Sequence, residues 1–475
     1  MTSKEIRQKF IKFFEERGHK VVPSSSLVPV GDQSVLLTTA GMQQFKPYYT
    51  GEKDPIKDFG ARRVASIQKS FRTSDIDETG DESHLTFFEM LGNFSFGDYF
   101  KEDAIKWGWE FITKEIEISP ERCRVSVFEG DPSTGLGQVV PEDTESIAIW
   151  KSLGLSDDKI KKAGREDNFW GPTGNEGPCG PTSEIYVDGI EVWNLVFNEY
   201  YCHSDKALEL LKQKGVDTGM GLERLAMAIQ STPTVFETDL FKLIIQLIPH
   251  RDISGEARAV RIIADHIRGA TFLIADGVLP SNITQGYILR RLLRRAIRYG
   301  RVLNLDKNFL ISLTQKVIEI YREFYPELSA KREDILIVIQ KEEEKFSKTL
   351  KQGLKEFDKM AASGFISGVE STTRLYQSYG FPIELIEEIA KEKKVKLSPN
   401  FKSEVKEEFK KHQEISRAGV GKKFGGHGIE AVKSESDKEK MTRLNTATHL
   451  LHQALHDVLG KEAEVKQMGS DITPE

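Results

Sequence analysis

The sequence has few cysteines and no long apolar run. Its 475 residues contain three cysteines, Cys123, Cys179 and Cys202, and no C-x-x-C pair. This odd, scattered set argues against a disulfide framework and against a thiolate zinc site, so a reducing cytoplasm is the expected location. Charged residues interrupt every apolar stretch before it is long enough to span a bilayer, which excludes a membrane-spanning helix and predicts no membrane partner.

A secretion signal is also missing at the N-terminus. Met1–Gly18 intersperses lysine and arginine with isoleucine and phenylalanine, which is typical of an amphipathic helix and not of a signal peptide's apolar core. Thr2 and Glu5 have the spacing of a capping box, in which each side chain bonds the other residue's backbone N–H. The sequence therefore predicts a capped helix at the start of the chain.

Overall charge and length place few limits on function. Lysine and arginine total 67, and aspartate and glutamate total 73, giving a formal net charge of −6. This mildly acidic balance neither predicts nor excludes a nucleic-acid partner. A chain of this length is expected to form two or three domains. The first half mixes strand-like runs with helices, whereas the sequence after about Pro233 is mainly helical, so we place a domain boundary near there.

The most informative segment is Asp217–Arg224, which combines a carboxylate, two glycines and an arginine at the start of an apolar, helix-like run. Gly219 and Gly221 allow the backbone to approach a ligand closely because they lack Cβ. Arg224 can direct a planar, permanently charged group at a phosphate or an adenine ring. The segment therefore combines a carboxylate that can bind a cation, Asp217, with an arginine that can bind a phosphate, Arg224. The alternative interpretation is an ordinary tight turn between a strand and a helix.

Two strands and a polar loop predict an antiparallel hairpin. The strands are Val64–Arg72 and His84–Leu91, and the loop is Thr73–Ser83. Alternation places four residues of each strand on a shared face. These residues are Ser66, Gln68, Ser70 and Arg72 on the first strand, and His84, Thr86, Phe88 and Met90 on the second. A face that is both polar and aromatic is suited to serve as a ligand platform.

A third strand is predicted at Glu191–Phe197, where Asn194 is a lone amide between Val192 and Val196. Either it contacts a ligand or the backbone satisfies it inside the core. The preceding segment, Phe169–Pro181, is too dense in glycine and proline for a helix or a central strand. It is expected to be a rigid loop that lines a pocket or an ordinary surface loop.

Arginine gathers on one side of a predicted helix at Ile288–Arg301. At about 100° per residue, six arginines occupy an arc of roughly 140°, and the opposite side is apolar. They are Arg290, Arg291, Arg294, Arg295, Arg298 and Arg301. An arginine front of this kind suits docking onto phosphates. The alternative is a surface helix whose arginines pair with acidic neighbours.

These segments resemble the motifs of the class II aminoacyl-tRNA synthetases. Their residue sequences are most similar to the motifs of the alanine-specific family. Phe71–Arg72 followed by Thr86–Phe100 is similar to the second class-defining motif, and Asp217–Arg224 is similar to the third. Further matching blocks are Phe169–Trp170, Gly177–Pro181, Val192–Asn194, Ala264–His266 and Gly286–Arg291. The resemblance covers nearly the whole chain.

The resemblance implies an α+β fold with an antiparallel sheet flanked by helices, followed by a mostly α-helical tRNA-recognition domain. It also implies that ATP and alanine form alanyl-adenylate and pyrophosphate before the alanyl group passes to tRNA(Ala). An in-line attack on the α-phosphate depends chiefly on positioning and on charge stabilisation by arginine and Mg²⁺. The expected domains are 1–235 for aminoacylation, 236–350 for acceptor-stem recognition, 351–440 for helical support and 441–475 for the start of an editing domain.

The resemblance also implies roles for individual residues. Arg72 would hold the α-phosphate and the amino-acid carboxylate, and Arg224 would hold the other end of ATP, with His84, Met90 and Gly221 beside the nucleotide. Asp217 would pair with the alanine ammonium. Asn194 would orient the substrate, and Val192, Trp170 and Gly219 would form the walls of a small cavity. The family's usual adenine-reading glutamate is replaced by Ser74. Glu89 and Glu184 are the candidate magnesium ligands.

The same comparison places tRNA contacts on the helical part. The arginine front would bind the acceptor stem, where Asn282 and Glu384 correspond to residues that read a G·U pair. In the family Glu384 is usually aspartate. The segment containing Asn445, His449 and His452 resembles the opening of an editing domain, so a fragment without most of that domain and the C-terminal region is expected. Because the usual earlier histidine is Asn445 here, zinc is not expected.

Three functions stay open at this stage. The first is a tRNA ligase, the second an ATP-dependent acyl-adenylate ligase with another acceptor, and the third a non-catalytic synthetase-like tRNA-binding protein. Arg72, Arg224, Asp217 and Asn194 speak against the third function. The arginine front speaks against the second.

Overall fold

The computed structural model describes residues 1–401 except 33, 132–138, 173, 252–253, 363 and 367–368, together with a few single positions beyond 401. The chain forms two compact units, residues 1–351 and 352–475. No helix in the described part of the chain has an apolar stretch that would span a bilayer. The domain bounds expected from the sequence stay a prediction.

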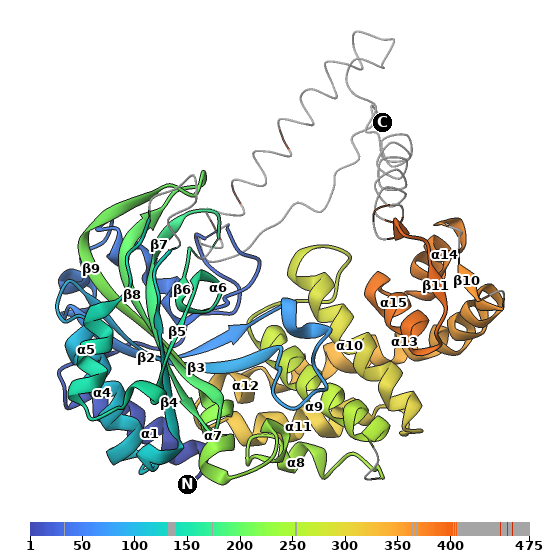
Figure 1. The fold of residues 1–475 in the computed structure, drawn as a ribbon. Coiled ribbons are helices and arrows are strands. Elements are labelled where there is room, and N and C mark those ends of the chain that lie inside the picture. Colours follow the sequence, from blue (N-terminus) through green and yellow to red (C-terminus); the bar gives the residue numbers. More distant parts are fainter. Residues whose placement is uncertain are drawn as a thin grey trace. The chain divides into compact units, whose positions relative to one another are not determined.

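Among the described residues, a nine-stranded sheet forms the centre of the first unit (Figure 1). The strand order is β1-β2-β3-β9-β8-β7-β4-β5, and β6 pairs with β7 beside this row. The pairs β1–β2 and β4–β5 are parallel, and the other pairs are antiparallel. The strands are β1 (Lys20–Val21), β2 (Arg63–Phe71), β3 (Phe87–Phe96), β4 (Cys123–Phe128), β5 (Ile160–Ala163), β6 (Phe169–Trp170), β7 (Gly177–Val187), β8 (Ile190–Cys202) and β9 (Leu208–Gly221).

Helices flank this sheet, which confirms the predicted α+β fold class; α9 to α12 lie beside β2 and β3 (Figure 1). The helices of the first unit are α1 (Ser3–Glu15), α2 (Lys46–Tyr49), α3 (Pro55–Phe59), α4 (Lys101–Glu110), α5 (Thr144–Ser152), α6 (Arg165–Asn168), α7 (Leu222–Gln230), α8 (Lys242–Ile245), α9 (Ser254–Ala275), α10 (Thr284–Val302), α11 (Phe309–Tyr321), α12 (Pro326–Ala330) and most of α13 (Arg332–Ala361). The second unit contains α14 (Val369–Tyr379), α15 (Ile383–Glu392) and a two-stranded sheet of β10 (Phe365–Ile366) and β11 (Lys396–Leu397).

The predicted N-terminal helix is α1, and its capping box is formed between Thr2 and Glu5. Its apolar side packs Phe10 and Phe14 against Trp193 of β8, with ring centroids 6.0 and 6.3 Å apart. These rings are buried and cover one face of the sheet, which we call the back face. Side chains alternate along each strand, so the neighbours of Trp193 in β8 point to the opposite face of the sheet. We call this opposite face the front face.

The predicted hairpin is formed by β2 and β3, with Gln68 opposite Met90 and Ser70 opposite Phe88. The second strand begins at Phe87 and not at His84, and it continues to Phe96. Of the three residues before it, His84 and Thr86 have their amides bound by groups outside the ladder. Asp81 accepts the His84 N–H at 2.8 Å, and Asp265 of α9 accepts the Thr86 N–H at 2.9 Å.

The interpretation of Phe169–Pro181 as a loop is wrong at both of its ends. Phe169–Trp170 forms β6, which pairs with Gly180 and Pro181. Gly177–Pro181 begins β7, which lies between β8 and β4 inside the sheet. Proline lacks the N–H that a strand ladder needs, but β4 pairs with β7 only from Ser183 onward, beyond both prolines. The register with β8 also slips between Cys179 and Thr182, and this bulge accommodates Gly180 and Pro181.

Candidate active site

The front face of the sheet carries most of the predicted site residues in neighbouring rows. In one row, Asn194 of β8 lies opposite Gly219 of β9, and Glu184 of β7 lies opposite Asn194. In the next row, Asp217 lies between Phe94 of β3 and Val196 of β8. On the other side of the Asn194 row, Met90 lies opposite Gly221. The antiparallel pairing thus brings together residues that are more than 120 positions apart in the sequence.

A pocket opens on this face above β3, β8 and β9 and encloses about 620 Å³ of empty space, part of it open to solvent. Seven of the predicted site residues line it. They are Arg72, His84, Met90, Val192, Gly219, Gly221 and Arg224. The pocket therefore unites the residues that were expected to hold ATP.

Arg72 is the cation at the centre of the pocket. Its guanidinium lies over the Phe88 ring, 5.0 Å from the centroid. Among the described residues it makes no hydrogen bond or ion pair, so its five N–H donors remain available. Burial lowers its pKa below the ordinary value, and Arg224 adds like-charge repulsion. An anion entering the pocket would relieve both effects.

Arg224 stands in the first turn of α7, where the strand β9 ends. Its Nη1 donates to the Glu191 carboxylate at 3.1 Å and to the Glu191 carbonyl oxygen at 3.2 Å. Glu191 also lines the pocket and was missed as a site residue, although it begins the strand predicted at Glu191–Phe197. Asp75 was missed as well, and it lines the pocket one position after Ser74. A carboxylate is therefore available in the pocket lining one residue after Ser74.

Asp217 is 4% exposed and lies outside the pocket lining. Its carboxyl group makes no hydrogen bond or ion pair to any described residue. Burial raises its pKa to about 8, from an ordinary value of 3.8. A buried carboxyl group without a partner is costly when ionised, and a cationic ligand is the partner that would restore its charge.

Asn194 has an unused acceptor. Its Nδ2 donates to Glu184 Oε1 at 3.0 Å, whereas its Oδ1 is buried with no hydrogen-bond partner in the described structure. Asn194 and Asp217 are diagonal neighbours across β8 and β9, a relation that typically separates residues by about 7 Å. Two acceptors at this spacing can bind one ammonium group between them.

Small residues and soft side chains limit the space beside these acceptors. A Cβ at Gly219 would lie 2.9 Å from Met90 Sδ, so the methionine closes the space above the glycine. Trp170 lies outside the pocket lining but packs, partly buried, against the cluster that contains Met90 and Phe94. At the rim, His84 bonds Asp81 and lies 3.2 Å from Glu78. Met90 therefore restricts the space beside Gly219 on the front face.

The two candidate magnesium ligands face opposite sides of the sheet. Glu89 lies on the back face, where Arg7 Nε donates to it at 2.9 Å and Tyr325 Oη at 2.8 Å. Its selection as a magnesium ligand is therefore wrong. Glu184 lies on the front face, where it accepts from Ser126, Tyr186 and Asn194. No cluster of three or more metal-binding side chains occurs in the described part of the chain.

The predicted arginine front of α10 is not a solvent-facing surface. Arg291, Arg294, Arg295 and Arg298 are 8, 5, 3 and 5% exposed. Arg291 pairs with Asp77 of the hairpin loop, and Arg294 Nε donates to Glu342 of α13 at 2.6 Å. The arginines therefore pair with acidic residues of other elements, Asp77 being exposed and Glu342 buried, which is the alternative interpretation of this pattern. Burial removes these four residues as a docking face.

Arg294→Met is expected to lower the free energy of unfolding by about 3 kcal/mol, because it leaves the Glu342 carboxylate buried without its partner. The double variant Arg294→Met/Glu342→Leu should recover most of that loss. Urea denaturation of both variants measures it. Arg290→Met is the control on the same helix, since Arg290 is partly exposed and bonds the exposed Asn282. An equal loss in Arg290→Met would contradict the buried-pair explanation.

The other predicted tRNA contacts are distributed over both units. Asn282 precedes α10 in the first unit and accepts a hydrogen bond from Arg290. Glu384 is partly exposed in the first turn of α15 in the second unit. Asn445, His449 and His452 lie outside the described residues, and the zinc prediction for them stays untested.

Comparisons with known proteins point to one family. The family model described as tRNA synthetases class II (A) matches residues 5–471. Alanine–tRNA ligase of Borrelia hermsii is 45% identical over 504 residues, covering 99% of this chain and 81% of that protein. Alanine–tRNA ligase of Dehalococcoides mccartyi is 41% identical over 493 residues, covering 96% of this chain and 54% of that protein.

A solved structure gives a weaker match. Pyrrolysyl tRNA synthetase of Desulfitobacterium hafniense aligns with a TM-score of 0.31 and 13% identity, covering 49% of this chain and 71% of that one. At this level the match adds nothing to the comparison of sequences.

Proposed function

The chain belongs to the family of class II (A) tRNA synthetases, and from this premise we propose that it activates alanine with ATP and transfers the alanyl group to tRNA(Ala). One observation on the site supports this function most directly. The buried, unpartnered acceptors of Asp217 and Asn194 lie beside a pocket that contains the unpartnered guanidinium of Arg72. A cation site next to an anion site suits an α-amino acid whose carboxylate meets a phosphate.

In the activation step, the alanine carboxylate oxygen attacks the α-phosphorus of ATP, and the bond to the pyrophosphate oxygen breaks. Asp217 and Asn194 would hold the ammonium, which fixes the carboxylate toward Arg72. Arg72 would bind the α-phosphate and stabilise the charge that develops on its oxygens. Arg224 and Glu191 would bind the nucleotide at the opposite wall, and Asp75 would read the adenine amino group. Mg²⁺ enters with the phosphates as part of the substrate.

The small space beside Gly219 supports alanine as the substrate. Met90 and Val192 line the pocket beside Gly219, and Trp170 packs behind Met90, so added methylenes on the substrate would meet these side chains. A pocket of this kind excludes larger amino acids sterically but separates alanine from glycine and serine by only roughly a few hundredfold. The cytoplasmic location predicted from the sequence accords with this function and stays a prediction.

The exposed pair of Asn282 and Arg290, with Glu384 of the second unit, is proposed to contact the acceptor stem. Burial of Arg291, Arg294, Arg295 and Arg298 weakens the sequence argument against a different acceptor, which had relied on the arginine front. That argument now rests on the alanine–tRNA ligase relatives. Transfer to tRNA therefore needs a test of its own.

ATP–pyrophosphate exchange with alanine, glycine and serine tests the activation step. We expect kcat/KM to be highest with alanine, and no exchange with any amino acid would contradict the function. Aminoacylation of tRNA(Ala) tests the second step. Asn282→Ala should slow charging at least tenfold and leave exchange unchanged, because it removes an acceptor-stem contact and not a contact to ATP. Exchange without charging of tRNA would indicate another acceptor.

A further inference from the structure

The sequence block Ala264–His266 matched the synthetase family but received no role from the proposed chemistry. Asp265 and His266 are fully buried on α9, on the back face of the sheet. Asp265 accepts two hydrogen bonds from one residue: the Thr86 N–H donates to Oδ1 at 2.9 Å, and the Thr86 hydroxyl donates to Oδ2 at 2.6 Å. Thr86 immediately precedes β3, at the end of the hairpin that adjoins its loop.

Thr86 is also the partner of Arg72. The Arg72 N–H donates to the Thr86 carbonyl oxygen at 2.9 Å, which is the last backbone bond of the hairpin. In an antiparallel ladder, two residues paired in this way exchange both of their N–H···O bonds. Here the Thr86 N–H donates to Asp265 instead of returning to Arg72. The Asp265 carboxylate therefore takes one of the two ladder bonds expected between Thr86 and Arg72, and Arg72 is the residue of this pair that lines the pocket.

A continuous chain of donors and acceptors supports Asp265 from behind. His266 Nδ1 is 2.9 Å from Asp265 Oδ2, and its Nε2 is 3.0 Å from Arg295 Nη1 of α10. Arg295 can only donate, so Nε2 accepts and the Nδ1–H donates to the carboxylate. Arg295 Nη1 also donates to the Ile76 carbonyl oxygen in the hairpin loop at 2.5 Å. Arg295 thus binds both the hairpin loop, at Ile76, and the imidazole ring of His266.

The rest of the α9 surface fits the same segment closely. Arg268 donates to the Phe87 carbonyl oxygen, and the Phe272 ring stacks on the Phe87 ring with centroids 4.1 Å apart. Gly269 lies between them, where a Cβ would come within 3.1 Å of the Thr86 hydroxyl. Residues 265, 268 and 272 recur at helical spacing and share one side of α9. One helix surface therefore sets the position of Thr86 and Phe87.

We propose that Asp265 is a positioning residue for Arg72, acting through Thr86, with Arg295 and His266 fixing the carboxylate. This inference rests on the proposed function, because it concerns the arginine that acts on the α-phosphate. Apart from the Phe88 ring, the Arg72 guanidinium has no side-chain partner among the described residues, so its backbone contact to Thr86 is a principal restraint on where the guanidinium points. A shift of about 1 Å in such a group can lower a rate by roughly a hundredfold.

The test is a double-mutant cycle between Asp265→Asn and Arg72→Lys, measured by alanine-dependent ATP–pyrophosphate exchange. Asparagine keeps the size of the side chain but removes one of the two acceptors. In the wild-type background, Asp265→Asn should lower kcat by roughly 30-fold and change the KM for ATP less than threefold. In the Arg72→Lys background the same substitution should lower kcat less than threefold, since the group it positions is gone.

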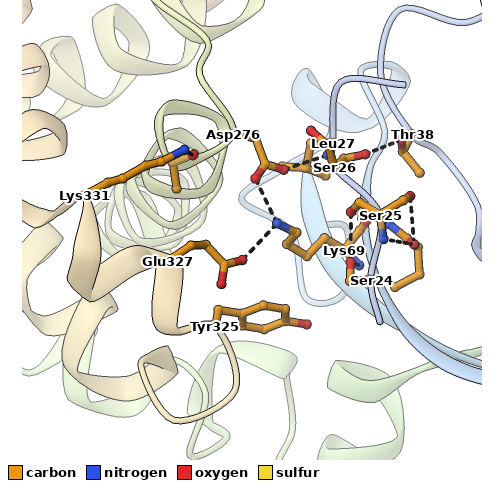
Figure 2. A network of polar contacts seen from close by, with 12 residues as sticks. Ser24, Ser25, Ser26, Leu27, Thr38, Lys69, Asp276, Tyr325, Glu327 and Lys331 are labelled. Carbon is orange, nitrogen blue, oxygen red and sulfur yellow. Dashed lines mark hydrogen bonds and ion pairs between the residues drawn. The ribbon is translucent and has the colours of Figure 1, made fainter. Parts of the chain in front are cut away.

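Asp276→Asn is the matched control at the end of the same helix. The Asp276 carboxylate accepts from Lys69 Nζ of β2 at 2.9 Å and from the Leu27 N–H at 2.6 Å (Figure 2). Neither bond involves Thr86 or Arg72. The Asp276 side chain is 8% exposed, and Glu327 also pairs with Lys69. This variant should lose a comparable amount of thermal stability while its kcat falls less than threefold. Thr86→Ser, which keeps both donors, should retain near wild-type kcat.

The outcomes separate the two proposals. A wild-type protein without alanine-dependent exchange overturns the proposed function. With an active wild type, an Asp265→Asn effect of equal size in both backgrounds, or one confined to the KM for ATP, overturns the positioning role alone. If Asp265→Asn proves too unstable to assay, Thr86→Val in the same cycle takes its place, because it removes only the hydroxyl donor to Asp265 and the same non-additivity is expected.

Discussion

Arg72→Ala is expected to lower kcat for alanine-dependent ATP–pyrophosphate exchange by roughly a thousandfold. The guanidinium lies inside the pocket on the Phe88 ring and makes no hydrogen bond or ion pair to any described residue. Its donors are therefore available to the phosphate without first breaking a contact within the protein. Because negative charge grows on the α-phosphate oxygens in the transition state, removing this cation should cost more in kcat than in substrate binding.

Arg124→Ala provides the control for this substitution. Arg124 is exposed on β4 of the same sheet, and its Nη1 donates to the Asp158 carbonyl oxygen at 2.9 Å. We expect unchanged exchange in that variant. A fall of less than tenfold in Arg72→Ala, with folding verified by circular dichroism, would show that another group stabilises the α-phosphate.

Asp217→Asn is expected to lower kcat/KM for alanine by roughly 100- to 1000-fold, because the alanine ammonium loses its ionic partner in a buried site. The protonated carboxyl group of the free protein and an amide have nearly the same shape. The variant should therefore fold like the wild type and keep its affinity for ATP. Exchange assays at varied alanine and ATP concentrations measure both quantities.

The same substitution should stabilise the free protein at alkaline pH. The pKa of Asp217 is about 8 in the folded protein and 3.8 ordinarily, so between these values the folded state holds a proton that the unfolded state has released. Stability of the wild type therefore falls as the pH rises from about 4 to about 8. Asparagine does not titrate, so the advantage of the variant should grow across this window, to on the order of 5 kcal/mol above pH 8.

Thermal denaturation of both proteins from pH 5 to pH 9 measures this difference. Asp188→Asn is the control: Asp188 is an exposed aspartate on the turn between β7 and β8, and Arg122 lowers its pKa below the ordinary value. That variant should gain no stability at alkaline pH and should retain exchange. If Asp217→Asn gives a constant difference at every pH, the carboxyl group does not titrate in this range.

The strand β9, which carries Asp217, was not predicted, but the hairpin and the Asn194 strand could both be predicted from the sequence. Each depends on alternation within a strand, and alternation requires no knowledge of the rest of the chain. The predictions erred where distant residues decide the outcome. Glu89 and Met90 are adjacent in β3, yet Arg7 and Tyr325 bind one on the back face while the other lines the pocket. Nothing local marks which face holds the ligand.

The α10 arginines show the same limit. Helical spacing correctly placed Arg291, Arg294 and Arg295 on one side of the helix, but it did not show what covers that side. Their partners, Asp77, Glu342 and Ile76, are 214, 48 and 219 positions away in the sequence. An arginine stripe looks the same before folding whether water, nucleic acid or buried carboxylates will face it.

The sequence by itself determined the local elements of this protein and its family. The capped first helix, the strand faces and the carboxylate–glycine–arginine segment follow from spacing, turn residues and side-chain chemistry over a few positions. Only the tertiary structure decided that Asp217 is buried without a partner, and that Asp265 joins Thr86 to the helices. Burial and pairing depend on which surfaces meet, and segments far apart in the chain meet only when the whole unit packs.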